Sequence, residues 1–99
     1  LKLITMDDVK NQSSEWPAYK KYFMHGTSHF LGLDVHDVGD WRQPIAAGNV
    51  FTVEPGIYIR EESLGIRIEN NIVITADGNT DMFDQFAIEV EEIESMMNG

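Results

Sequence analysis

Five side chains in the middle of this sequence are of types that bind divalent metal ions. Three histidines, His25, His29 and His36, fall within twelve positions, and two glutamates, Glu54 and Glu69, follow in stretches that alternate as strands do. Neutral imidazole and carboxylate groups suit Mn, Zn, Fe or Co, and each must be deprotonated to bind. The spacing alone also allows ordinary core or surface histidines and exposed glutamates. The helical H-E-x-x-H motif of single-zinc peptidases is not present in the sequence.

The composition excludes some types of metal ligand and disfavours some classes of binding partner. The sequence has no cysteine, so a metal would be bound by nitrogen and oxygen alone, and a cytoplasmic location is expected. Seven basic and seventeen acidic side chains give a net charge of −10, which disfavours nucleic acid as a partner. No apolar run approaches the roughly 20 residues that cross a bilayer, so no membrane partner is expected. The 99 residues suffice for one small domain at most.

Two helices are predicted near the beginning of the chain. Thr5 and Asp8 have the spacing of a capping box, in which hydroxyl and carboxylate each bond a free amide, so residues 6–9 are expected to be helical. Ser13 or Ser14 offers a second N-cap, and aromatic residues follow at the spacing of one helical face. We interpret this face as packing against the core. Its residues are Trp16, Tyr19 and Phe23.

Strands are predicted where the candidate ligands lie, because apolar residues there recur with a period of two. Pro55 favours an extended backbone at Glu54, and Gly56 allows a turn just after it. An Asp77-Gly78 pair indicates a turn, and a last helix begins near Val90 with its glutamates in solvent. The expected strands are 29–36, 50–54, 57–59, 65–75 and 83–88.

Three segments resemble motifs of one metallopeptidase family. Residues 25–39, HGTSHFLGLDVHDVG, look like the histidine motif of Xaa-Pro aminopeptidases and prolidases. Residues 51–59, FTVEPGIYI, resemble the family's first glutamate strand, and residues 65–75, GIRIENNIVIT, resemble its second. With the intervals between them the segments span about half of the chain. The resemblance implies an α+β fold, the C-terminal portion of a pita-bread fold, in which a curved, mainly antiparallel sheet has flanking helices.

The resemblance also implies roles for individual residues. His29, Glu54 and Glu69 match metal ligands, and in the family the second glutamate bridges two ions. His25 and His36 match residues that bind the substrate, while His36, Glu54 and Arg67 match residues of the catalytic site. The family's two aspartate ligands lie well upstream, ten residues apart, and no such pair is present here. We therefore expect two divalent ions in the complete enzyme and one or none in these 99 residues; Mn²⁺ is the expected metal, with Zn²⁺ or Co²⁺ as alternatives.

The function implied by the resemblance is metal-dependent hydrolysis of an N-terminal Xaa-Pro bond. Residues 1–99 would form a single partial domain, the C-terminal part of the catalytic domain of a homo-oligomeric parent, with a proline-containing peptide as substrate. Prolidase, which cleaves Xaa-Pro dipeptides, is an alternative, as are methionine aminopeptidase, creatinase and a noncatalytic peptide-binding module of the same fold. The string LDVHDVG favours the proline-directed enzymes, TSH favours the aminopeptidase, and the three intact ligands disfavour the noncatalytic module.

Overall fold

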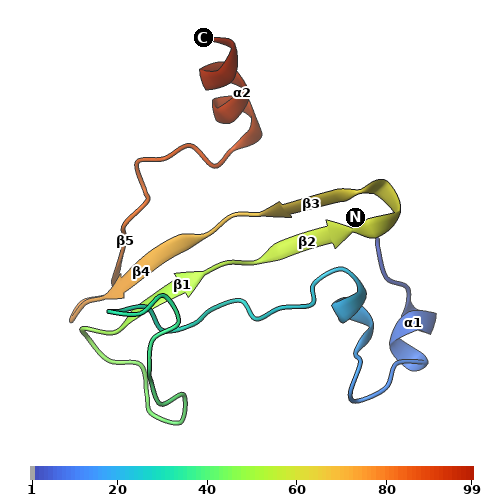
Figure 1. Ribbon diagram of the computed structural model, residues 1–99, viewed down its shortest axis with the longest axis horizontal. Helices are drawn as coiled ribbons and strands as arrows, with labels where there is room; N and C mark the ends of the chain where they lie inside the picture. The colour runs from blue at the N-terminus through green and yellow to red at the C-terminus, as the bar shows by residue number, and fades with distance from the viewer. Residues whose placement is uncertain (1) are drawn as a thin grey trace.

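The computed structural model describes residues 2–99, and their central feature is a long two-stranded ribbon (Figure 1). One sheet has the strand order β1-β4-β5 and the other pairs β2 with β3, all antiparallel. Two α-helices and two short 3-10 helices complete the secondary structure of the described residues. The elements are α1 (Met6–Lys10), η1 (Ala18–Lys21), β1 (Val50–Val53), β2 (Gly56–Ile59), η2 (Arg60–Glu62), β3 (Leu64–Arg67), β4 (Asn70–Ile74), β5 (Asn79–Asp81) and α2 (Val90–Asn98).

The two sheets share one register and form a single ribbon with a short gap. Val53 pairs with Asn70 on one side of the gap, and Gly56 pairs with Arg67 on the other. Each strand therefore has two residues in the gap. Pro55 has no N–H to donate to a ladder, which fits its place between the paired segments. In this register Glu54 lies directly opposite Glu69.

An irregular segment, residues 27–31, runs along the free edge of β1. Its hydrogen bonds join Leu31 N to Val50 O, Thr52 N to His29 O and Glu54 N to Thr27 O, at 2.8–3.0 Å. An isolated antiparallel bridge pairs Phe30 with Phe51, so His29 lies opposite Thr52. The segment therefore places a histidine beside the strand that ends at Glu54.

The packed interior of the described residues is small and lies next to this segment. The rings of Phe30, Trp41 and Phe51 have centroids 4.6–5.5 Å apart, and Phe51 is the one buried hydrophobic side chain of residues 2–99, at 6% exposed. A Cβ on Gly39 would overlap the Phe30 ring, so glycine is needed there for the contact. The cluster anchors the segment that contains His29 to β1.

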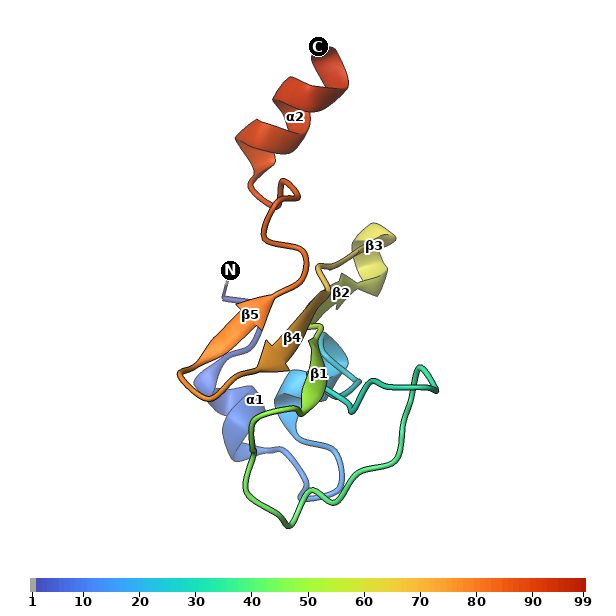
Figure 2. The same cartoon turned by 90° about the vertical axis from the view of Figure 1, so that its left-hand side faces the viewer.

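Most of the remaining apolar surface is open. The accessible surface of 8134 Å² exceeds the roughly 5,700 Å² expected of a compact protein of this mass. The radius of gyration, 17.1 Å, exceeds the value of about 13 Å for a compact chain of this length. One face of the ribbon exposes Val53, Leu64 and Ile66, and α2 extends away from the sheets in both views (Figures 1 and 2). No helix within residues 2–99 has the length and apolarity that crossing a membrane requires.

Several predicted elements are confirmed. In α1, Asp8 N donates to Thr5 Oγ1 at 3.1 Å and Thr5 N donates to Asp8 Oδ2 at 2.7 Å, which is the expected capping box. The strands expected at 50–54 and 57–59 are β1 and β2, and the one expected from 65 is divided into β3 and β4. The Asp77-Gly78 turn follows β4, with Thr75 N bonded to Gly78 O, and α2 begins at Val90.

The predicted second helix is wrong. Only η1 forms there. Trp16 N donates to Ser13 Oγ at 3.0 Å, as expected of an N-cap, but Ala18 N donates to Gln12 Oε1 at 2.9 Å, so a side chain takes the place of a helical carbonyl. Trp16 and Tyr19 are more than half exposed and half exposed respectively, so our interpretation of a core-facing aromatic stripe is also wrong for the described structure.

Two predicted strands are wrong as well. The one expected at 29–36 ends after Leu31, because Asp37 Oδ2 accepts from Leu33 N and Asp37 N donates to Phe30 O, which closes a loop and leaves Leu33 fully exposed. The one expected at 83–88 is a turn, in which Phe83 N donates to Asp81 Oδ1 and Phe86 N to Phe83 O. The last strand is instead β5, which was not predicted.

Candidate metal centre

The structure brings the three expected ligands together at the gap in the ribbon. One ligand atom each from His29, Glu54 and Glu69 lies within 4.8 Å of the others. The side chains of His29 and Glu54 are mostly buried, at 20% and 14% exposed, and that of Glu69 is 37% exposed. Like charges directly opposite one another on a ladder are destabilising. The Glu54–Glu69 pair therefore favours a positive charge between the strands.

The imidazole of His29 has the hydrogen bonding expected of a candidate metal ligand. Its Nδ1 lies 2.9 Å from the carbonyl oxygen of Phe30, and because a carbonyl can only accept, Nδ1 bears the hydrogen. In the neutral ring Nε2 then directs a lone pair toward Glu54 Oε1, 3.1 Å away. Two acceptors at this distance need a cation or a proton between them. Two ligand atoms each about 2.1 Å from one ion are about 3.0 Å apart at a right angle, so the donor set fits a divalent metal.

Thr52 forms hydrogen bonds with both of these candidate ligands. At 1% exposed it is the most buried side chain of the described residues, and it is polar. Its Oγ1 accepts from the backbone N–H of His29 at 3.0 Å and donates to Glu54 Oε1 at 3.1 Å. Groups that orient metal ligands in this way affect metal affinity strongly. The sequence reasoning missed Thr52, although its spacing of two from Glu54 places both on one strand face.

The other expected site residues surround the same region. A hollow of about 370 Å³ is lined by His25, His29, His36, Glu54 and Arg67, together with Gly26 and Ser28. The loop closed by Asp37 brings the His36 ring to 4.2 Å from the His29 ring, between centroids. Arg67 Nη2 lies 3.7 Å from Glu69 Oε2, a weak ion pair at an exposed edge. Glu69 adjoins this hollow without lining it.

A second residue that the sequence reasoning missed is Tyr58. Its hydroxyl oxygen lies 2.8 Å from His25 Nε2, and it follows Glu54 by four positions, on the same face of the ribbon. The period of two along β1 and β2 was therefore the signal that could have identified both Thr52 and Tyr58.

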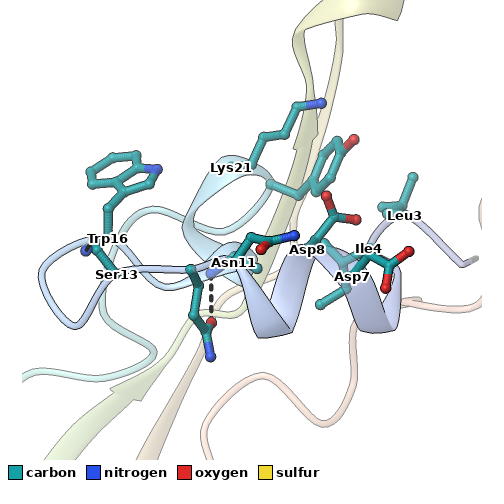
Figure 3. A pocket seen from close by; sticks show the side chains of 11 residues that line it. Leu3, Ile4, Asp7, Asp8, Asn11, Ser13, Trp16 and Lys21 are labelled. Carbon is teal, nitrogen blue, oxygen red and sulfur yellow. Dashed lines mark hydrogen bonds between the residues drawn. The ribbon is translucent and has the colours of Figure 1, made fainter.

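Another hollow, of about 550 Å³, lies between α1 and the segment that leads into η1 (Figure 3). Its charged groups already have partners. Hydrogen bonds from Thr5 lower the pKa of Asp8, Asp7 Oδ1 lies 4.0 Å from Lys10 Nζ, and contacts with Tyr22 and Glu61 raise the pKa of Lys21. The hollow has no histidine among its lining residues. Asp7 and Asp8 thus belong to the helix start and lie apart from the candidate metal centre.

Comparison with known proteins agrees with this geometry. Residues 4–76, which include all the expected site residues, match the profile of metallopeptidase family M24. The chain belongs to metallopeptidase family M24. Its α+β architecture is accordingly confirmed as part of a pita-bread fold, which the solved M24 structures it resembles share.

Several relatives of this M24 chain are named as Xaa-Pro aminopeptidases. It is 43% identical over 96 residues to the Xaa-Pro aminopeptidase of Haemophilus influenzae and 46% identical over 92 residues to that of Escherichia coli. These matches cover 85% and 81% of the chain but only 22% and 21% of the relatives. The structure of E. coli aminopeptidase P with the inhibitor Pro-Leu superposes with a TM-score of 0.77 at 44% identity, covering 82% of this chain and 21% of that one. The M24 chain thus spans about a fifth of the length of these proteins.

Proposed function

We propose that this chain is the C-terminal part of a catalytic domain that hydrolyses the N-terminal Xaa-Pro bond of peptides. The observation that supports the proposal most is the register of the ribbon, which puts Glu54 opposite Glu69 with His29 within 4.8 Å. The names of the relatives, Xaa-Pro aminopeptidases in two bacteria, give the substrate class.

The proposal that the chain is one part of a larger domain rests on its surface. About 2,400 Å² of accessible surface in excess of a compact protein is the amount that large interfaces bury. The open ribbon face formed by Val53, Leu64 and Ile66 is apolar, so covering it would stabilise the fold. The remaining segments of the catalytic domain would cover this apolar face. They would also supply further metal ligands on the other face of the ribbon, where Glu54 and Glu69 lie.

His29, Glu54 and Glu69 would hold the metal. Mn²⁺ is the ion we propose, and we propose Zn²⁺ as a substitute because a zinc-substituted E. coli aminopeptidase P is among the structures similar to this chain. When bound, divalent ions in such a site polarise the scissile carbonyl and lower the pKa of water. Three ligands suffice for one ion, and a second ion requires carboxylates from outside residues 2–99.

Residues of this chain would also transfer the proton and bind the substrate. Glu54 is a mostly buried carboxylate within the candidate ligand cluster and would accept the proton of the attacking water. His36 lies beside His29 in the exposed loop and would donate a hydrogen bond to the substrate, and Arg67 would orient Glu69 and the substrate. Proline has no amide hydrogen and a fixed ring, so its recognition depends on a shaped, apolar contact, for which His25 is placed in the wall of the hollow.

The test is hydrolysis by the complete polypeptide that contains this segment. With Mn²⁺ it should release the first residue of an Xaa-Pro-Xaa tripeptide, and a chelator should stop the reaction. Glu54→Gln should lower kcat by about 10²- to 10⁴-fold, the usual contribution of a general base. Glu62→Gln, which changes an exposed glutamate in η2, is the matched control and should leave the rate unchanged.

Turnover that persists in chelator, or in Glu54→Gln, would refute the proposed chemistry. Cleavage of Xaa-Pro dipeptides but not tripeptides would identify a prolidase in place of the aminopeptidase. Peptide binding without any cleavage by the metal-loaded protein would identify a noncatalytic module.

A further inference from the structure

The imidazole of His25 is fixed on three sides. Its Nδ1 lies 2.7 Å from the carbonyl oxygen of Gly26, and its Nε2 lies 2.8 Å from the hydroxyl of Tyr58. The ring also meets Phe23 edge to face, with centroids 5.0 Å apart and planes at 82°. His25 is thus held more firmly than His36, which lies in an exposed loop.

The direction of these hydrogen bonds follows from the groups involved. A carbonyl only accepts, so Nδ1 of His25 donates to Gly26. In the neutral ring Nε2 has the lone pair, and the Tyr58 hydroxyl donates to it. Both nitrogens are then satisfied by the protein. What the imidazole can offer to the hollow is its carbon surface, which suits an apolar ring better than a hydrogen-bonding group.

Two glycines leave room for the side chain of Tyr58. It pairs with Gly65 across the β2–β3 ladder, and a Cβ on Gly65 would lie 2.8 Å from its ring. A Cβ on Gly56 would lie 2.8 Å from its hydroxyl oxygen and 3.1 Å from His25 Nε2. The strand is tied down by Tyr58 N, which donates to Tyr22 O at 2.9 Å. The two glycines therefore make the space in which the tyrosine and histidine meet.

We propose that Tyr58 is a positioning residue that occupies Nε2 of His25 and so sets the preference of the site for a proline ring. Tyr58 does not line the hollow, whereas His25 does, so its effect on a substrate would pass through the histidine. The substrate part of this proposal rests on the proposed Xaa-Pro hydrolysis. The hydrogen bond between the two side chains does not.

The first test removes only the hydroxyl. Tyr58→Phe keeps the aromatic ring between the glycines, and Tyr19→Phe is the matched control, because it deletes the hydroxyl of a half-exposed tyrosine outside the hollow. In the complete enzyme, Tyr58→Phe should raise KM for an Xaa-Pro tripeptide about 3- to 10-fold, the worth of one neutral hydrogen bond, with kcat within about twofold. Cleavage of the matching Xaa-Ala peptide should change little. An unaltered ratio of kcat/KM for the two peptides would overturn the proposal.

A double-mutant cycle tests whether the effect passes through His25. On a His25→Ala background, Tyr58→Phe should have no further effect on the Pro/Ala ratio. Effects that multiply would show that Tyr58 acts independently of the histidine and would refute the positioning role.

The last test needs no activity. In ¹⁵N spectra of the imidazole, His25 of the wild type should show a hydrogen on Nδ1 and an Nε2 that accepts a hydrogen bond, and the Nε2 resonance should shift in Tyr58→Phe but not in Tyr19→Phe. An Nε2 resonance unchanged by Tyr58→Phe would overturn the proposal. If the wild type failed to cleave Xaa-Pro peptides, the proposed function would fall, and this measurement would still decide the role of Tyr58.

Discussion

Replacing Thr52 by valine should weaken metal binding without changing a ligand. Valine keeps the volume and the strand preference of threonine but has no hydroxyl. The change removes the donor to Glu54 Oε1 and the acceptor of the His29 N–H. One N–H left without a partner next to the most buried side chain should lower the free energy of unfolding by about 1–3 kcal/mol. The freed ligands should lower Mn²⁺ affinity about 10- to 100-fold, as loss of a supporting group typically does.

Thr52→Ser is the comparison that separates the two effects. It keeps the hydroxyl and removes one methyl group, which should lower the free energy of unfolding by about 1 kcal/mol. Calorimetric titration of the complete protein with Mn²⁺ should give nearly wild-type affinity for the serine variant and weak binding for the valine variant. Wild-type affinity in Thr52→Val, or equal loss in both variants, would mean that the hydroxyl does not orient the ligands.

Three further predictions follow from the ribbon and the first helix. Without metal, Glu69→Gln should alter the free energy of unfolding of this chain by less than about 1 kcal/mol in a denaturant titration. The reason is that the ion pair between Glu69 and Arg67 is exposed and 3.7 Å long. A larger loss of stability would show that the two side chains are more strongly paired. Gly65→Ala should destabilise by about 1–3 kcal/mol in thermal unfolding, because its Cβ would meet Tyr58 at 2.8 Å, whereas Gly26→Ala, with its nearest atom at 3.9 Å, should not. Thr5 lowers the pKa of Asp8 in the folded chain, so the stabilisation from this capping pair should be fully present above pH about 4. It should be lost as the pH falls through the lowered pKa of Asp8 in the folded chain. Asp8→Asn should remove this dependence of stability on acid pH.

The local elements could be predicted because the signals for them are local. Thr5 and Asp8 are close enough in sequence to form a capping box by themselves, and Pro55 fixes the backbone of Glu54 whatever surrounds it. The alternation in β1 and β2 likewise requires only neighbouring residues. The placing of His29, Glu54 and Glu69 near one another was expected from the family resemblance, and their spacing alone left surface residues as an alternative.

The wrong predictions of secondary structure come from interactions that the alternation of apolar and polar residues does not reveal. The alternation after Leu31 is that of a strand, but the Asp37 carboxylate bonds backbone amides of the same segment and turns it into a loop. The strand β5 has a polar sequence, Asn79–Asp81, and exists because its backbone pairs with β4. Glu54 could be assigned to a strand, but its position opposite Glu69 depends on the register set at the η2 hairpin end.

The gap between the two paired halves of the ribbon has a mechanical consequence. Twisted two-stranded ribbons flex, and a place without ladder bonds is where a bend concentrates. The end of β2, Ile59, lies five residues beyond Glu54, about 17 Å along the strand, so a bend of about 10° at the gap would displace that end by about 3 Å. The ligand atoms at the gap lie within 4.8 Å of one another, so the same bend would change their separation by less than about 1 Å. A hairpin that swings against other parts of the protein would therefore leave the spacing of Glu54 and Glu69 almost unaltered, because both lie on the axis of the motion.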